Sequence, residues 1–496
     1  MVTIRSALAS LLALYGITIP LFAENFFIDN PQTTIYIILC CFIISLLLYS
    51  GKVLLFNLLI AFYVFKQYLT RPYVDIFHDK LNASQLEYIL KTNYYNSAEA
   101  EVVFLSLLSL LIAWMLGLFI MRPKKSFKSS YPWIFKEIDN IVSTPNWKFW
   151  LVLASLFILN YVSVEVLWKS LKGVQSTTTF AYGMLGTNLI ASSCLVHFIY
   201  AKNIGASKTH LTLLIPSIIT GLLGVFNGGR SGLYIFFVIM FLYWIYLNFN
   251  RNINYKDIGR FFILGISIPF LLFTALIAGT SKSFLRISAM QGMDQSYWEV
   301  LTTNINIFNP DNALIGSLYF DLTKIFHRLS QIEQPLLILN DRYINLPWET
   351  FNPMQTFMRI INDLVPGTIF HDVININRLF HHIYFDEFVN FASHTWSIQG
   401  TMYLFFGFLG SPIFVFLIAL FVARFYVNVS YLAKLSPTFF VFITYIFLNL
   451  VEFGVLERIL VVDIVRPITS LIAVIFMVKI LDFIFLKIRF KNIFLK

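Results

Sequence analysis

The first candidate for chemistry in the sequence is an arginine that follows two glycines, between two apolar segments. The six residues read Asn227-Gly228-Gly229-Arg230-Ser231-Gly232. Glycines permit close approach of the backbone to a ligand, and the planar guanidinium of Arg230 offers paired donors for a phosphate. The alternative is a tight turn between helices whose arginine reaches lipid head groups. Both interpretations stay open on the residues alone.

Two residues further along the chain extend this candidate chemistry. Arg286 follows the ninth apolar segment, where it offers either a second phosphate contact or a head-group contact. His394 precedes the tenth apolar segment, and Ser393 or Thr395 is placed to cap the helix expected there. The positive end of that helix disfavours imidazolium, which leaves a neutral ring able to accept a proton. A packed or surface histidine is the alternative.

Metal chemistry is weakly indicated. His381 and His382 stand near Asp386 and Glu387, but adjacent histidines point in different directions. The three cysteines all lie inside apolar runs, as small buried side chains do. We therefore expect no metal site.

Charged residues inside the apolar segments need partners. Arg458, beside Glu457, lies near the predicted outer end of the eleventh segment, where it either lines a cavity or forms a structural ion pair. Lys479 and Asp482 are three residues apart in the last segment, a spacing that permits a local pair. No ladder of buried carboxylates typical of an ion relay is present in the sequence.

The elements that must position these residues are membrane spans. The 496 residues are 58% hydrophobic and 12% charged, far from the composition of a soluble domain. Twelve apolar segments are long enough to cross a bilayer. They run near residues 4–23, 33–50, 52–69, 98–121, 147–168, 181–201, 209–227, 232–248, 260–280, 400–424, 436–455 and 464–486. We predict an all-α polytopic membrane protein of about twelve transmembrane helices.

Lysine and arginine near the segment ends give the orientation. If the helices alternate, the basic clusters after the fourth, sixth, eighth and twelfth segments fall on one side, which the positive-inside rule assigns to the cytoplasm. Both termini then lie in the cytoplasm, and Arg230 and His394 face the periplasm of a bacterial inner membrane. The net charge of +10 is thus a topology signal, and no nucleic-acid binding is expected.

One connection is much longer than the others. It spans 281–399 and is acidic, with eleven Asp and Glu against seven Lys and Arg. Asn309-Pro310 and Asn352-Pro353 are helix-start signals, and Pro366-Gly367 is a stop signal. A loop of this length is usually functional, and we expect it to be partly helical.

This loop divides the chain into three regions. Residues 1–280 hold the first nine spans, 281–399 form the large periplasmic loop, and 400–496 hold the last three spans. Aromatic side chains in the loop, Trp396 among them, either stack on sugars or anchor the loop at the interface.

Together, these features resemble the Wzy-type O-antigen and oligosaccharide repeat-unit polymerases. The shared features are the twelve segments, the Gly-Gly-Arg-Ser-Gly turn, the loop after the ninth segment and the element that follows the histidine. Here that element reads His394-Thr-Trp-Ser-Ile-Gln-Gly-Thr-Met-Tyr-Leu-Phe-Phe406-Gly407-Phe-Leu-Gly410. The related O-antigen ligases have a similar element. The resemblance covers the architecture of the whole chain, and its local motifs are short.

The resemblance implies a metal-independent membrane glycosyltransferase of the GT-C type that needs no cofactor. Such a polymerase moves a growing glycan from undecaprenyl pyrophosphate onto the terminal sugar of a new lipid-linked unit, and a chain-length regulator is an implied partner. On this chain, Arg230 and Arg286 would hold the pyrophosphate, and His394 would deprotonate the acceptor hydroxyl. The residues implied to contact substrate are Gly228, Gly229, Arg230, Ser231, Arg286, Trp396 and Arg458. Thr395 and Trp396 depart from the ligase pattern.

Two other functions remain open. An O-antigen ligase shares the donor but passes the glycan to a lipid A core, and the form of the His394 element favours the polymerase. A flippase or transporter for lipid-linked oligosaccharides predicts short loops, two similar halves and charged spans, which this sequence does not have.

Overall fold

A computed structural model shows the architecture. It describes residues 3–22, 31–78, 81, 100–123, 131–158, 187–205, 211–226, 231–254, 259, nine isolated positions between 323 and 370, 398–453 and 464–494. Within these ranges the chain is helical, apart from turns and one isolated antiparallel bridge between Thr3 and Asn252. The predicted all-α class is confirmed for the described part of the chain.

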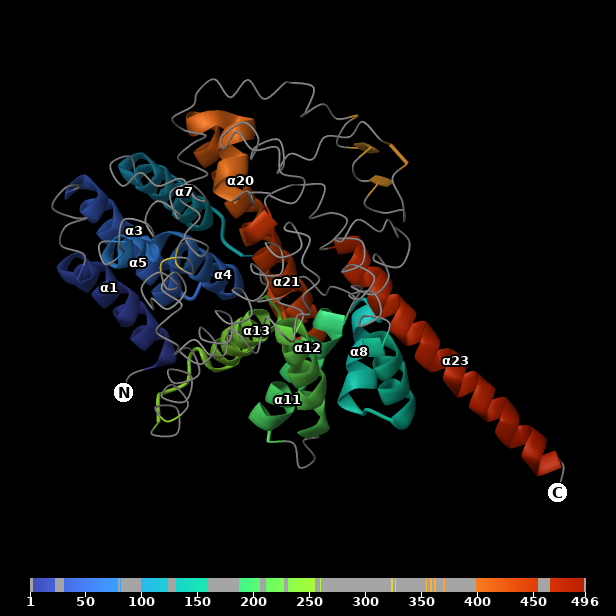
Figure 1. The fold of residues 1–496 in the computed structure, drawn as a ribbon. Helices are drawn as coiled ribbons and strands as arrows, with labels where there is room; N and C mark the ends of the chain where they lie inside the picture. The colour runs from blue at the N-terminus through green and yellow to red at the C-terminus, as the bar shows by residue number, and fades with distance from the viewer. Residues whose placement is uncertain are drawn as a thin grey trace, which may run out of the picture.

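Long apolar helices pack side by side in one half of the molecule (Figure 1). α1 packs on α3, α3 on α7, and α7 on α20, and α21 follows α20 toward the centre. The bounds are α1 Ile4–Phe22, α3 Pro31–Ser50, α4 Leu54–Val64, the π-helical turn η1 Phe65–Leu69, α5 Arg71–His78, α7 Ala100–Ile120, α20 Ile398–Leu435 and α21 Pro437–Phe453.

The other helices gather around α21. α11 contacts α12, α13 and α21, and α8 lies against α23, which extends away from the body in Figure 1. The bounds are α8 Trp133–Ser143, α11 Thr187–Asn203, the 3-10 turn η2 Leu211–Leu214, α12 Ile215–Phe226, α13 Ser231–Asn248 and α23 Arg466–Phe494.

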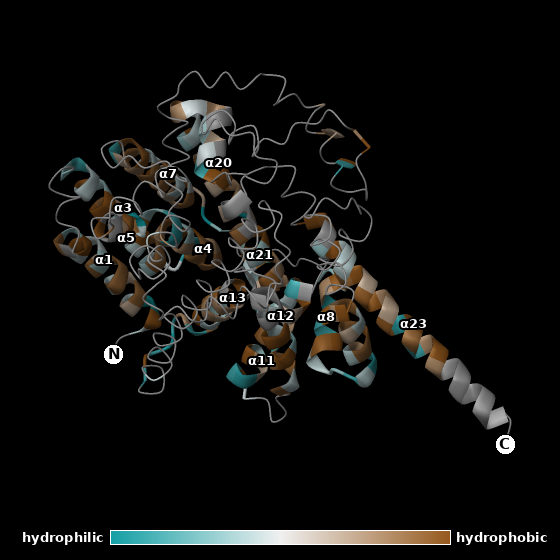
Figure 2. Ribbon diagram, viewed as in Figure 1, coloured by the Kyte–Doolittle hydropathy of each residue, from teal (hydrophilic) through white to brown (hydrophobic). Residues whose placement is uncertain are grey.

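The surface of these helices is apolar, as a lipid environment requires. Figure 2 shows hydrophobic residues along most of their length, and large side chains such as Leu21, Phe119 and Phe483 are more than two-thirds exposed. Five described helices are long and apolar enough to cross a membrane: Ile4–Leu21, Pro31–Ser50, Ala100–Ile120, Phe406–Leu435 and Pro467–Phe485. Trp133–Ser143 and Trp147–Ile158 form a further pair, bent by 105°. These described helices therefore have the length and composition of membrane-spanning helices.

Segments predicted to lie on the same side of the membrane come together. The backbone N–H groups of Ile4 and Arg5 donate to the carbonyls of Arg251 and Phe249 at 3.1 and 3.0 Å. The Arg5 guanidinium lies 4.7 Å from the centre of the Tyr49 ring, next to the turn between α3 and α4. Three predicted inner ends are therefore neighbours, which agrees with alternating helices.

The expected local pairing of Lys479 with Asp482 is wrong. The Lys148 ammonium contacts the Asp482 carboxylate, and the Lys479 ammonium lies 3.4 Å from the Glu137 carboxylate. Both pairs join α23 to the α8 region, because α23 presents this face to a neighbouring helix instead of to lipid. The charged residues in the last span therefore hold two helices together.

The helix expected over 400–424 is longer and broken. α20 continues to Leu435, and Gly407 interrupts it with φ 67° and ψ 179°. A residue with a side chain is strained at this positive φ, so glycine is needed here. The break at Gly407 therefore divides α20 into a short first part and a longer part, and the apolar stretch long enough to cross a membrane is Phe406–Leu435.

Isolated positions in the long loop agree with its predicted helices. Thr323 and Phe326 are helical within the first expected helix, and Met354 and Asn362 are helical within the second. The Asn362 side chain bonds the backbone of residues 369 and 370 at 2.8–3.0 Å. Residues 369 and 370, just beyond the Pro366-Gly367 stop signal, therefore lie against Asn362.

Replacement of Gly117 by leucine is expected to lower the thermal stability of the protein in detergent. A Cβ atom on Gly117 would lie 2.6 Å from the Ala419 Cβ and 2.8 Å from the Phe416 carbonyl oxygen, so α7 and α20 would have to separate. Overpacking of this kind costs about 1–3 kcal/mol. The control is Leu116→Ala, at an exposed neighbouring position. Equal melting temperatures for the two variants would contradict the close α7–α20 contact.

Candidate functional site

Most of the residues assigned to chemistry from the sequence lie outside the described residues. These are Gly228, Gly229, Arg230, Arg286, His394, Trp396 and Arg458. Ser231 is described as the first residue of α13, and α12 ends at Phe226. α12 and α13 pack against each other, so residues 227–230 join two neighbouring helices. The turn expected at residues 227–230 lies outside the described residues, and it and the roles of its residues stay predictions.

A polar cluster lies at the predicted outer end of the bundle. We call it the outer cluster and define it as Tyr63, Tyr68, Ser106, Gln399 and Tyr403, with Lys66 and Arg71 close by in the sequence of η1 and α5. Its side chains come from α4, η1, α7 and α20, and each is buried. The ends predicted near residues 69, 98 and 400 therefore meet, as the alternating topology requires.

Gln399 connects the first turns of α7 and α20. Its side-chain amide donates to the Ser106 hydroxyl at 2.5 Å and lies 3.4 Å from the Tyr403 hydroxyl. It also lies 3.5 Å from the Val103 carbonyl, which can only accept, so the nitrogen faces that way. Gln399 stands five residues after His394. The helix start expected after His394 is thus fixed to α7.

Lys66 lies in the π-helical turn η1, and Arg71 is the first residue of α5, two residues after that turn. Lys66 is 7% exposed and Arg71 is 1% exposed. The Thr70 hydroxyl donates to the Lys66 carbonyl at 2.6 Å, and the Tyr15 hydroxyl of α1 donates to the Leu69 carbonyl. π-turns inside α-helices are frequent at functional sites, because the extra residue redirects the side chains around it.

The long loop reaches the edge of this cluster. The Phe326 ring stacks on the Tyr73 ring of α5, with centroids 5.2 Å apart and planes at 25°. Tyr73 is two residues after Arg71. A loop of more than one hundred residues thus contacts α5, the helix that begins with Arg71, as expected if the loop covers a site.

The sequence contained a signal for these cations. Lys66 lies near the end of the third apolar segment and Arg71 just after it, on the side that the positive-inside rule leaves poor in basic residues. Basic residues at the outer end of a helix do not help to orient it, so they indicate another structural or functional role.

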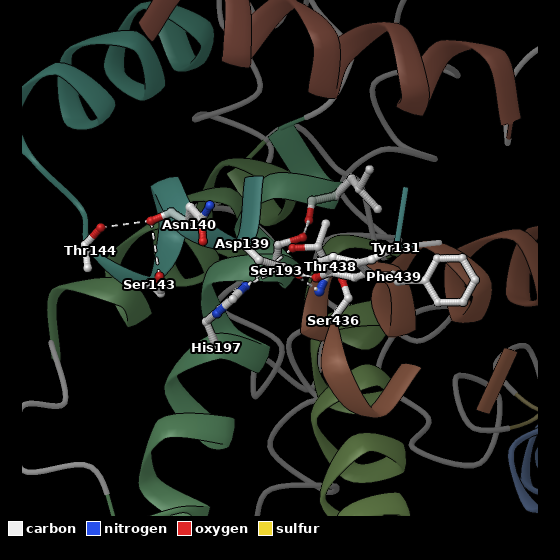
Figure 3. A network of polar contacts seen from close by, with 11 residues as sticks. Tyr131, Asp139, Asn140, Ser143, Thr144, Ser193, His197, Ser436, Thr438 and Phe439 are labelled. Carbon is white, nitrogen blue, oxygen red and sulfur yellow. Dashed lines mark hydrogen bonds and ion pairs between the residues drawn. The ribbon is translucent and has the colours of Figure 1, made fainter. Parts of the chain in front are cut away.

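A second polar network lies at the predicted inner end (Figure 3). The Asp139 carboxylate of α8 is 2.8 Å from Nε2 of His197 on α11, and it accepts from the Thr438 backbone N–H at 3.3 Å and from the Tyr131 hydroxyl. The Thr438 hydroxyl is 3.5 Å from the same His197 Nε2. Three helices, α8, α11 and α21, are joined at this point.

This inner network has the residue types of a hydrolytic triad but not the geometry. In a triad the carboxylate and the nucleophile contact different nitrogens of the ring. Here Asp139 and Thr438 share Nε2. His197 and Asp139 are also only 6% and 12% exposed, so the network serves to clamp helices.

Asp139 lies outside the predicted spans, and its surroundings set its charge state. Burial raises the pKa of the Asp139 carboxyl, but the hydrogen bond and charge of His197, with hydrogen bonds from Ser436 and Thr438, outweigh burial. The pKa is therefore below its ordinary value. A depressed carboxyl pKa stabilises the fold above the pKa of the unfolded chain, and this stabilisation is lost as pH falls through the folded pKa.

Replacement of Asp139 by asparagine is expected to cost about 1–3 kcal/mol at neutral pH, because His197 loses a charged partner in a buried place. The measurement is the melting temperature in detergent from pH 7 down to about 3, across the ordinary carboxyl range. The wild type should lose stability toward the acid end, and Asp139→Asn should lose less. Asn140→Asp, on the exposed side of α8, is the control. Parallel acid curves for wild type and Asp139→Asn would rule out the clamp.

Among the described residues, no group of three or more His, Cys, Asp or Glu is arranged to hold a metal ion. Comparisons with protein-family models, curated proteins and solved structures find no match to this chain.

Proposed function

We propose that this chain is a twelve-span, GT-C-like polymerase of lipid-linked oligosaccharide repeat units. The proposal places the reaction at the periplasmic face of a bacterial inner membrane. The growing glycan would leave undecaprenyl pyrophosphate and join the terminal sugar of a newly arrived lipid-linked unit. The pyrophosphate is the leaving group, so the protein's work is to position two substrates and stabilise developing charge.

The observation that carries the proposal is the outer cluster. Tyrosine hydroxyls and the start of α20 meet at one end of the bundle, two buried cations follow Tyr63 in the chain there, and the long loop contacts α5 through Phe326. This combination suits a lipid pyrophosphate with an attached sugar, because it offers positive charge at the interface and aromatic faces above it.

In this mechanism, His394 takes the proton of the acceptor hydroxyl as that oxygen attacks the anomeric carbon. The bond from that carbon to the pyrophosphate oxygen breaks, and Arg230 and Arg286 stabilise the charge on the leaving pyrophosphate. No metal and no nucleotide sugar take part.

Deletion of the gene in a bacterium that makes long O-antigen tests the proposal. We expect lipopolysaccharide that carries a single repeat unit, and recovery of the full ladder when the gene is returned. Core without glycan, with lipid-linked polymer accumulating, would contradict polymerisation and indicate a ligase. Loss of all periplasmic units would indicate a flippase.

A further inference from the structure

α8 turns sharply away from the helix that follows it. The two helices are bent by 105° to each other, and the second, Trp147–Ile158, is the described part of the fifth predicted span. The bend has a local cause, because Pro145 follows α8 and the Asn146 side chain caps the next helix by accepting the Phe149 backbone N–H at 3.0 Å. A helix nearly perpendicular to a span lies close to the membrane plane, so α8 runs across the predicted inner face.

The two faces of α8 differ in polarity. Phe135 and Ile138 are buried, and the Phe135 ring packs on the Phe439 ring of α21 with centroids 5.1 Å apart. Lys136 and Asn140 lie on the opposite face and are exposed. α8 therefore covers neighbouring helices with its apolar face and presents its polar face to the predicted cytoplasm.

On one side, α8 completes the cap of another helix. The Ser436 hydroxyl accepts the Phe439 backbone N–H at 3.0 Å within the start of α21, and the Asp139 carboxylate of α8 accepts the Thr438 backbone N–H. The same carboxylate contacts His197 of α11 (Figure 3). Withdrawal of α8 would leave these buried groups of α11 and α21 without their acceptor, which is costly in a place poor in water.

On the other side, α8 and the turn after it hold α23. The Trp147 ring packs edge-on against the Phe485 ring with centroids 4.7 Å apart. The two ion pairs between α23 and the α8 region add to this contact. Among the described elements, α8 is the main neighbour of α23. α23 is therefore joined to α11 and α21 by way of α8.

We propose that α8 is a fixed cytoplasmic plug, which keeps the inner ends of α11, α21 and α23 together throughout the working cycle of the protein. Alternating access would require these ends to separate, and both sets of contacts made by α8 would have to break. The lipid-linked substrates then arrive, and the polymer leaves, from the outer side alone. This consequence for the substrates rests on the proposed function, whereas the fixed position of α8 does not.

The reactivity of single cysteines toward a maleimide that cannot cross the membrane tests the plug. In inside-out membrane vesicles, Asn140→Cys should react freely. Ile138→Cys should react at least about tenfold more slowly, because a buried position is reached only when α8 opens locally. Added undecaprenyl-pyrophosphate-linked repeat units should change neither rate. The natural cysteines Cys40, Cys41 and Cys194 are buried, and the parent protein gives the background.

A rate for Ile138→Cys that rises to the rate of Asn140→Cys when substrate is added would overturn the plug. Val142→Cys, at an equally buried position on the same face, replaces Ile138→Cys if that variant does not fold. It should be as slow, with and without substrate.

Cross-linking tests whether the plug stays closed during turnover. Trp147 and Phe485 are 51% and 42% exposed, so cysteines at these two positions are within reach of a short bismaleimide. We expect the cross-linked double variant to form polymer at the same rate as before cross-linking. Loss of polymer formation on cross-linking, with both single-cysteine variants unaffected by the reagent, would show that α8 and α23 must separate and would reject the plug.

The gene-deletion ladder is independent of the cysteine reactivity. A polymerase ladder, together with an Ile138→Cys that becomes reactive with substrate, rejects the plug alone. A ligase phenotype, together with an Ile138→Cys that stays unreactive, rejects the polymerase alone.

Discussion

Replacement of His394 by alanine is expected to reduce glycan polymerisation by about 10²–10⁴-fold, the usual contribution of a general base. The acceptor hydroxyl is a poor nucleophile until its proton is removed, and the proposed function assigns that step to His394. The helix start itself survives the substitution, because Gln399 fixes it to Ser106 on α7. The loss should therefore fall on the rate and leave the protein folded.

The measurement is the rate of polymer formation by purified protein with lipid-linked repeat units, together with the lipopolysaccharide ladder in cells. His381→Ala, in the same loop and without an assigned role, is the control and should give a full ladder. The rate should also fall below the pKa of the His394 ring in the wild type, because a protonated ring cannot accept a proton. A wild-type ladder in His394→Ala would remove the histidine from the mechanism.

The long apolar helices were predicted correctly from the sequence. α1, α3 and α7 match their predicted segments to within about two residues, because in a bilayer the length of an apolar run decides a helix almost alone. Helical positions in the long loop, at Met354 and Asn362, also agree with the helix predicted from Asn352-Pro353, because Asn-Pro is a local signal with a local mechanism.

Features that depend on contacts between residues far apart in the chain could not be predicted from the sequence. Lys148 and Asp482 pair across 334 residues, so the spacing of Lys479 and Asp482 pointed to the wrong partner. The break at Gly407 depends on the backbone conformation of that residue, which the residue types at Phe406 and Gly407 do not determine. The side chains of the outer cluster come from helices far apart in the sequence. Its one sequence signal was that Lys66 and Arg71 lie on the side that the positive-inside rule leaves poor in basic residues.

Replacement of Arg230 by alanine is expected to reduce polymerisation by about 10²–10³-fold, as when one donor to a developing negative charge is lost. Arg230→Lys keeps the charge but loses the planar pair of donors, so an intermediate rate is expected. Lys202→Ala removes a cation from the last turn of α11, at the predicted inner end, and should leave the ladder unchanged.

The kinetic pattern of Arg230→Ala decides between its two interpretations. If the guanidinium stabilises charge as the pyrophosphate leaves, the contact strengthens in the transition state, and kcat falls while the KM for the donor changes little. If Arg230 only contacts a head group, it binds the ground state equally well, and the KM for the donor rises while kcat is kept. If kcat falls in Arg230→Ala and Arg230→Lys restores it only in part, both the positive charge and the paired donors of the guanidinium act on the leaving group. A change in KM alone would return Arg230 to the role of a membrane anchor and transfer leaving-group stabilisation to Arg286.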